Sequence, residues 1–181
     1  MKNYFESPIE EFAEYLFASD RIGKSFSEEE KAGILSEIFS IAHNAALEES
    51  NSGIGRDPVH YIRERMQIEP VKKTVIEAYS DYVYPDNIIH LYLNRIEELY
   101  LDLKDALSSD ISKDHLINII LIHEYFHYLE KNKIGDLSAK YSKKGIFGNK
   151  KFTNASEIGA FVFSRMVTGD PEKYLSNGGD R

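Results

Sequence analysis

The chain has 181 residues, 42% of them hydrophobic, so it is long enough to bury one core and short for two domains. Its 30 acidic residues outnumber its 22 basic ones, and the formal net charge of −8 would repel a phosphate backbone, which argues against nucleic acid as a partner. The sequence has no cysteine, which excludes both a disulfide framework and a thiolate metal site.

The N-terminal segment and the apolar runs bear on where the protein resides. The first 17 residues include four glutamates and lack the uninterrupted apolar core of a signal peptide. The longest apolar run, Leu116 to Ile122, contains Asn118 and falls short of the roughly 20 residues that a membrane-spanning helix needs. We therefore expect a soluble, cytoplasmic protein that does not enter a membrane.

Three helices are predicted in the first 70 residues. Each begins with a serine or aspartate that can cap the first turn, and apolar residues then follow at helical spacing. Two of the three starts also place a proline just after the cap, where a helix tolerates it. The predicted helices cover residues 8–18, 28–51 and 58–66, and their caps are Ser7, Ser27 and Asp57.

The hydrophobic period then changes from helical to alternating. Residues 74–84 and 88–94 are rich in Val, Ile and Tyr, and Tyr84-Pro85-Asp86-Asn87 separates them as a turn. Apolar and polar residues alternate along the second segment, as in a strand with one buried face. The sequence therefore predicts a β-hairpin at about 74–94.

Helical spacing returns in the C-terminal half of the chain. Predicted helices cover residues 94–107, 112–132 and 156–167, with a surface loop or small hairpin at 145–151. Asn94 and Ser112 are the expected caps of the first two, and Gly135 is the expected stop of the second. We expect a mostly helical α+β fold, in which a small antiparallel sheet packs beside the last two helices.

One short motif carries chemistry. His123-Glu124-Tyr125-Phe126-His127 reads H-E-x-x-H, and residues four apart lie on one face of a helix, so both imidazoles can reach one ion. A zinc ion held in this way lowers the pKa of its bound water to about 7. Glu124, beside the first ligand, can take the proton of that water and pass it to a leaving amine.

A catalytic zinc site needs a third protein ligand, and no histidine follows the motif, so that ligand must be a carboxylate. Glu157 stands at the start of a predicted amphipathic helix that can pack beside the motif helix. We therefore expect His123, His127 and Glu157 to bind Zn²⁺ while Glu124 acts as the base. The other acidic residues after the motif are Glu130, Asp136, Asp170, Glu172 and Asp180.

Two segments resemble a known family. Residues 119–127 are an apolar run that ends in H-E-x-x-H, and residues 157–163 read E-x-x-A-x-x-F. In both, the chain resembles the ImmA/IrrE family of small metallopeptidases, which are of the gluzincin type. The resemblance implies a metallopeptidase core at 71–170, in which the strand at 88–94 is an edge that pairs with an extended protein substrate. We expect one domain over 1–181, made of a helical N-terminal region (1–70), this core and a tail (171–181).

The chain departs from the family at two places near the site. Tyr125-Phe126 replaces the commoner Leu-Gly, which implies a bulkier pocket behind the metal. Phe161 stands where a typical gluzincin has an acidic residue. The partner that orients a metal-binding histidine must therefore come from elsewhere, and Asn132 and Asn154 are candidates.

Peptide hydrolysis also needs a donor that stabilises the developing oxyanion. Tyr141 lies between the two motifs, His90 shares a strand face with Tyr92, and His115 lies two turns before His123. We take Tyr141, His90 and His115 as candidates for contacts with the oxyanion or the substrate.

Three functions are compatible with these residues. The first is a zinc-dependent metallopeptidase that cleaves a protein or peptide substrate. The second is a metal-containing regulatory module that binds a partner protein without turnover. The third is a zinc hydrolase that acts on a nonpeptide amide. Only the two hydrolases require Glu124.

Overall fold

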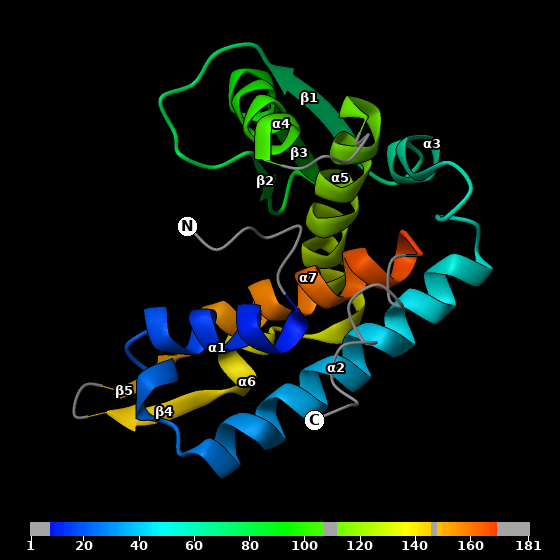
Figure 1. Ribbon diagram of the computed structural model, residues 1–181. Helices are drawn as coiled ribbons and strands as arrows, with labels where there is room; N and C mark the ends of the chain where they lie inside the picture. The colour runs from blue at the N-terminus through cyan, green and yellow to red at the C-terminus, as the bar shows by residue number, and fades with distance from the viewer. Residues whose placement is uncertain (1–7, 107–111, 146–147, 170–181) are drawn as a thin grey trace, which may run out of the picture.

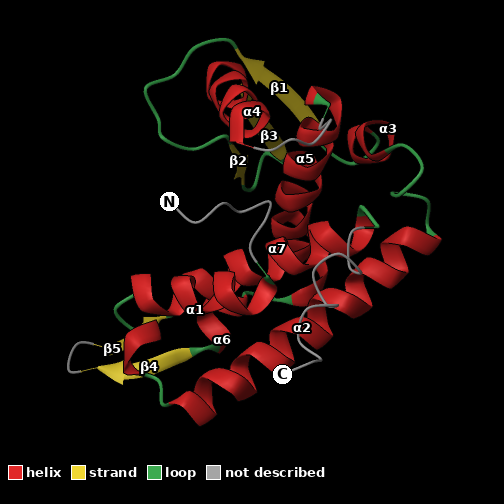
Figure 2. Ribbon diagram, in the orientation of Figure 1, coloured by secondary structure: helices red, strands yellow, loops and turns green. Residues whose placement is uncertain are grey.

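Residues 8–106, 112–145 and 148–169 are described by a computed structural model. Over these residues the chain is mostly helical, with one sheet of three strands and one of two, which confirms the α+β class (Figure 2). None of the described helices is both long enough and apolar enough to cross a membrane. The helices are α1 (Ile9–Ser19), η1 (Gly23–Ser25), α2 (Glu28–Asn51), α3 (Pro58–Arg63), α4 (Leu93–Ala106), α5 (Lys113–Leu129), the π-helical η2 (Glu130–Ile134), α6 (Leu137–Lys140) and α7 (Asn154–Val167). The strands are β1 (Gln67–Val71), β2 (Ser80–Val83), β3 (Ile88–Tyr92), β4 (Ser142–Gly145) and β5 (Gly148–Lys151).

Side-chain caps explain where several helices begin. Ser27 and Glu30 form the expected capping box at the start of α2, each side chain accepting from the other residue's backbone amide. The side chains of Asp57 and Ser112 accept a hydrogen bond from the amide three residues later, at the starts of α3 and α5. Gly135 follows η2 with a φ of 96°, a backbone conformation that favours glycine. The cap expected at Ser7 lies outside the described residues, as does the tail at 171–181.

The larger sheet contains the predicted hairpin and one strand that was not predicted. β2 pairs antiparallel with β3, but it begins at Ser80 and not near residue 74. β1 pairs in parallel with β3, so the sheet is mixed. β1 was missed because it contains Pro70, which has no N–H group to donate to a neighbouring strand and so argues against a strand in the sequence. An edge strand such as β1 tolerates proline.

The expectation that the strand at 88–94 is an edge was wrong. β3 lies between β1 and β2, so neighbouring strands occupy both of its hydrogen-bonding sides. The other strand of the hairpin, β2, is at an edge of the sheet. Asn94 does not cap the next helix, because α4 already begins at Leu93. Its side chain instead accepts from the amide of Thr74 at 3.0 Å and donates to the carbonyl of Thr74 at 3.2 Å.

The core of the helical layer surrounds α7. Ten of the 14 residues of α7 are buried, and α1, α2 and α5 all pack against it (Figure 1). The ring of Phe161 lies 4.2 Å from that of Phe12 on α1, and Phe163 lies 5.4 Å from Phe126 on α5. The described part of the N-terminal region therefore belongs to the same core as α7.

α5 connects this helical layer to the sheet. It contacts β2 and α3 as well as α7, and in Figure 1 it runs from the sheet and α4 down to α7. The last turns of α5 carry the H-E-x-x-H motif and lie beside the first turns of α7, which carry Glu157. The crossing of these two helices thus brings the two sequence motifs together.

Candidate metal centre

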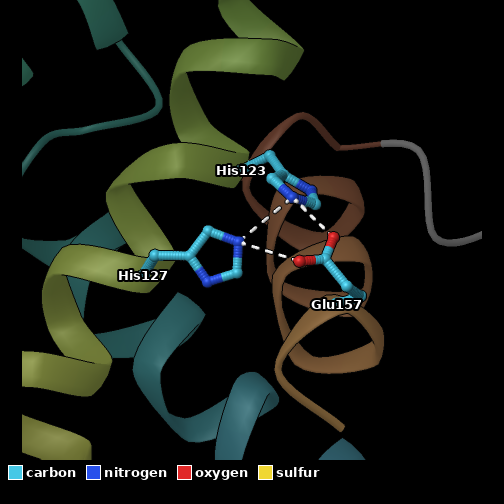
Figure 3. Close-up of side chains that lie close together, drawn as sticks. All are labelled: His123, His127 and Glu157. Atoms are coloured by element: carbon cyan, nitrogen blue, oxygen red, sulfur yellow. Dashed lines mark hydrogen bonds and ion pairs between the residues drawn. The ribbon is translucent and has the colours of Figure 1, made fainter. Parts of the chain in front are cut away.

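His123, His127 and Glu157 point toward one another across the crossing of α5 and α7 (Figure 3). The Nε2 atoms of the two histidines are 3.3 Å apart. Glu157 places Oε2 at 3.3 Å from Nε2 of His123 and Oε1 at 3.6 Å from Nε2 of His127. The three residues therefore form a group that could hold a metal ion, since one possible ligand atom from each lies within 4.8 Å of the others.

The spacing within this group is compatible with the donor separations of a tetrahedral zinc ion. Donor atoms held at 2.0–2.1 Å from a tetrahedral ion lie about 3.3–3.4 Å from each other. The separation of the two Nε2 atoms and that of Nε2 of His123 from Oε2 of Glu157, both 3.3 Å, match that value. The 3.6 Å contact to His127 is made by the other carboxylate oxygen of Glu157, Oε1. Two imidazoles and one carboxylate would leave a fourth position open, which is the arrangement of catalytic zinc sites.

The charges of the cluster favour a cation. The side chain of Glu157 is 48% exposed, so its desolvation by the surrounding chain is partial. This desolvation acts against the charged form, but the hydrogen bond and charge of His123, together with the charge of His127, lower the pKa of Glu157 to about 2. Burial also acts against the charged form of His123, yet Glu157, Glu124 and Glu130 together raise the pKa of His123. Three carboxylates therefore face two histidines, and a divalent cation would balance the excess of negative charge.

Glu130 is the partner that orients the second histidine, a role that the sequence analysis did not assign. Glu130 is 4% exposed, and its Oε2 lies 3.0 Å from Nδ1 of His127. The hydroxyl of Ser156 also donates to Oε2 of Glu130 and lies 3.1 Å from the same Nδ1 atom of His127. With Nδ1 held in this way, Nε2 of His127 is directed toward His123 and Glu157.

The two asparagines suggested for this role lie elsewhere. Asn154 donates to the carbonyl of Leu16 at 2.8 Å and to the hydroxyl of Ser19 at 3.0 Å, which ties α7 to α1. Asn132 donates to the carbonyl of Tyr128, one turn back in its own helical segment. The suggestion was wrong because Asn132 finds a local backbone partner, whereas Asn154 bonds across the helix interface to α1.

The departures from the family pattern also have a structural explanation. Phe161, in the place of the usual acidic residue, is fully buried against Phe12 of α1, so this position does not serve the metal site. Phe126 is accommodated by Gly159, because a Cβ atom at residue 159 would lie only 2.6 Å from the Phe126 ring. The bulky motif residue thus fills the space that a glycine on α7 leaves.

Glu124 lies beside the cluster in a cavity of about 650 Å³. The residue is only 5% exposed, and its Oε1 accepts a hydrogen bond of 2.6 Å from the hydroxyl of Ser80 on β2. The segment Glu77–Tyr82 lines one side of the cavity, and α5 and α7 contribute the histidines and Glu157. A buried carboxylate therefore lies within the same cavity as the candidate metal ligands.

The three candidates for oxyanion or substrate contacts are not among the residues that line this cavity. The hydroxyl of Tyr141 donates to Glu37 on α2 at 2.8 Å, and this contact together with burial raises the pKa of Tyr141. His90 pairs through Nδ1 with Asp81 at 2.8 Å, and the amide of His115 donates to the cap of α5. Lys131, one turn beyond His127, is the cation among the described lining residues, and nothing in its sequence context distinguished it.

The remaining acidic candidates for a metal ligand are accounted for. Asp136 caps α6 by accepting from the amide of Ala139 at 2.9 Å, and it pairs with Lys151 at the same distance. Asp170, Glu172 and Asp180 lie outside the described residues. Within the described part of the chain, Glu157 is the carboxylate that joins the two histidines in a group able to hold a metal ion.

Comparison of the chain with protein-family models, with curated proteins and with solved structures finds no match. The resemblance to the ImmA/IrrE metallopeptidases therefore rests on the two short motifs.

Proposed function

We propose that the protein is a zinc-dependent metallopeptidase in which His123, His127 and Glu157 bind the ion and Glu124 is the catalytic base. The observation that carries the proposal is the convergence of two imidazole Nε2 atoms and the carboxylate of Glu157 at 3.3–3.6 Å, with the buried carboxylate of Glu124 in the same cavity. The resemblance of both motifs to those of the ImmA/IrrE family supports the same reaction.

Glu124 performs the proton transfers in this mechanism. When bound at such a site, zinc polarises a carbonyl group and lowers the pKa of a water molecule to about 7. The carboxylate of Glu124 accepts a proton from the attacking water and then delivers it to the nitrogen of the leaving amine. Burial of Glu124 restricts the access of other water, so the proton stays available for the amine.

The substrate that fits this cavity is an extended peptide. Among the described residues, β2 has one neighbour in the sheet, β3. The other side of its backbone is therefore open to pairing with an added strand. The same segment lines the cavity from Glu77 to Tyr82. A peptide paired with β2 would therefore pass beside Glu124 and the metal ligands, as in β-strand addition.

The test is the substitution Glu124→Gln in the zinc-loaded protein. The introduced glutamine keeps the shape of the side chain but accepts no proton, so we expect hydrolysis to fall by about 10²–10⁴-fold. Zinc content should stay at the wild-type value because the ligands are untouched. Cleavage of a proteome-derived peptide library, measured by mass spectrometry, and metal analysis of the same samples give both quantities.

Glu48→Gln is the matched control, since Glu48 is an exposed glutamate on α2 that pairs with Lys133. It should cleave the library like the wild type. Zinc-dependent cleavage that survives Glu124→Gln would refute the assigned base. Zinc binding without cleavage of any peptide by the wild type would refute the peptidase and leave the binding module or the nonpeptide hydrolase.

A further inference from the structure

The side chain of Glu124 has a specific partner on the sheet. Its Oε1 accepts a hydrogen bond of 2.6 Å from the hydroxyl of Ser80. Ser80 lies 44 positions before Glu124 in the chain, so the contact depends on how β2 docks against α5. It is not a consequence of local helix geometry.

Two parallel contacts fix the position of β2 along α5. Ser80 and Tyr82 lie on the same face of the strand, because side chains alternate. Ser80 contacts Glu124, while the ring of Tyr82 meets that of Tyr128 edge-on at 6.3 Å. Two residues of strand span about 6.6–6.8 Å and four residues of helix about 6.0 Å, so the two pairs match in spacing.

The backbone of Ser80 is also held in place. Ser80 is the first residue of β2 and lies opposite Leu91 of the central strand. Just before it, the carbonyl of Tyr79 accepts from the amide of Tyr92 at 3.0 Å. The hydroxyl is therefore presented from a backbone that is bonded to β3 on both sides of the residue, and its direction toward Glu124 is set by the sheet.

We propose that Ser80 is a positioning residue for the catalytic base, an inference that rests on the proposed function. Its hydroxyl occupies Oε1 of Glu124, restricts the rotation of the carboxylate and leaves Oε2 to face the attacking water. Since β2 is also the edge on which the substrate is proposed to lie, one strand orders both the peptide and the base. Ser80 acts through Glu124 and touches no reacting atom.

Kinetics of the zinc-loaded Ser80→Ala variant test this role. Loss of one charge-assisted hydrogen bond should lower kcat about 10- to 100-fold, while KM stays within about twofold and zinc content is unchanged. Ser80→Thr keeps the hydroxyl and suits a strand, so it should recover most of kcat. Ser36→Ala makes the same change at an exposed serine on α2, outside the site, and should retain the wild-type kcat. An unchanged kcat in Ser80→Ala, or an equal loss in Ser36→Ala, would overturn the proposal.

A second measurement does not depend on turnover. The urea midpoint of the zinc-loaded protein is compared for the wild type, Ser80→Ala, Glu124→Ala and the double variant. If the hydroxyl holds the carboxylate, Ser80→Ala shifts the midpoint less in the Glu124→Ala background than in the wild type. Equal shifts in the two backgrounds would refute the contact. If no peptide is cleaved by the wild type but the shifts differ, the proposed function fails while the contact between Ser80 and Glu124 stands.

Discussion

His127 is the best-supported side chain of the site at the scale of single residues. Its Nε2 atom faces His123 and Glu157, while Nδ1 lies 3.0 Å from Oε2 of Glu130 and 3.1 Å from the hydroxyl of Ser156. Glu130 in turn accepts from the backbone amide of Leu137 through Oε1 at 3.2 Å. Both oxygens of this buried carboxylate therefore accept hydrogen bonds, so an amide in its place would leave one donor facing another.

We expect Glu130→Gln to weaken zinc binding about 10- to 100-fold, because the ring of His127 loses an ionised partner and the amide nitrogen opposes a donor. Competition with a chelator of known zinc affinity measures the change. Asp136→Asn is the control: it makes the same carboxylate-to-amide change nearby, at a residue that caps α6 and does not contact the histidines. An unaltered zinc affinity in Glu130→Gln would show that Glu130 does not orient His127.

The candidate metal ligands were predictable from the sequence, whereas the residues that hydrogen-bond to the site were not. Residues four apart on a helix share a face, which placed His123 and His127 together, and the amphipathic pattern after Glu157 placed the third donor. Glu130 lies three residues after His127, and that helical spacing was a usable signal for it. The hydroxyl of Ser80 comes from a distant strand, so no local pattern could indicate it.

At the scale of elements, the approach of α5 to α7 decides the geometry of the candidate metal site. Gly159 lies on α7 two positions after Glu157, and Phe126 lies on α5 next to His127. A Cβ atom at residue 159 would come within 2.6 Å of the Phe126 ring and 2.9 Å of Leu137. The close approach of the two helices therefore requires glycine at this position, in a helix where alanine would otherwise be favoured.

Gly159→Ala should destabilise the protein by about 1–3 kcal/mol, since the added methyl group forces Phe126 or the helices apart. Gly33→Ala is the matched control, because Gly33 is also helical and has nothing within 4 Å of an added Cβ. It should stabilise the protein by roughly 0.5–1 kcal/mol. Urea unfolding of both variants checks the opposite signs. Equal effects would mean that the two helices do not pack as closely as described.

The sheet shows why secondary structure was predicted better for helices than for strands. The caps at Ser27, Asp57 and Ser112 are local signals, and each helix begins beside its cap. β1 carries Pro70 and has a partner, β3, that follows it by about 20 residues, so its existence depends on tertiary pairing. That missing strand is also why β3 was taken as the edge and β2 was not.

At the scale of the whole molecule, the N-terminal helices hold the helix that carries Glu157. The start of α7 is tied to α1 by Asn154, while Phe12 and Phe17 of α1 pack on Phe161 and Phe152. α5 is tied to α2 in turn, because the buried carboxylate of Glu49 on α2 accepts a hydrogen bond from the hydroxyl of Tyr125 on α5 at 2.9 Å. Residues of the 1–70 region therefore contact both helices of the candidate metal site, a role that the sequence alone did not reveal.

This arrangement predicts how removal of the metal affects stability. A ligand that binds only the folded state stabilises it by about 2.7 kcal/mol at one hundred times its Kd, which corresponds to a Tm increase of about 5–10 °C for a chain of this length. The proposed ligands join α5 to α7, and α7 shares its core with α1 and α2. We therefore expect the entire chain to unfold in a single calorimetric transition, whose Tm zinc raises. An excess of EDTA should reverse the increase.

Glu157→Ala should abolish the difference in Tm between zinc and EDTA, whereas Glu29→Ala, at an exposed glutamate on α2, should retain it. Two separate transitions, with only one sensitive to zinc, would instead mean that residues 1–70 and 71–170 fold as independent domains.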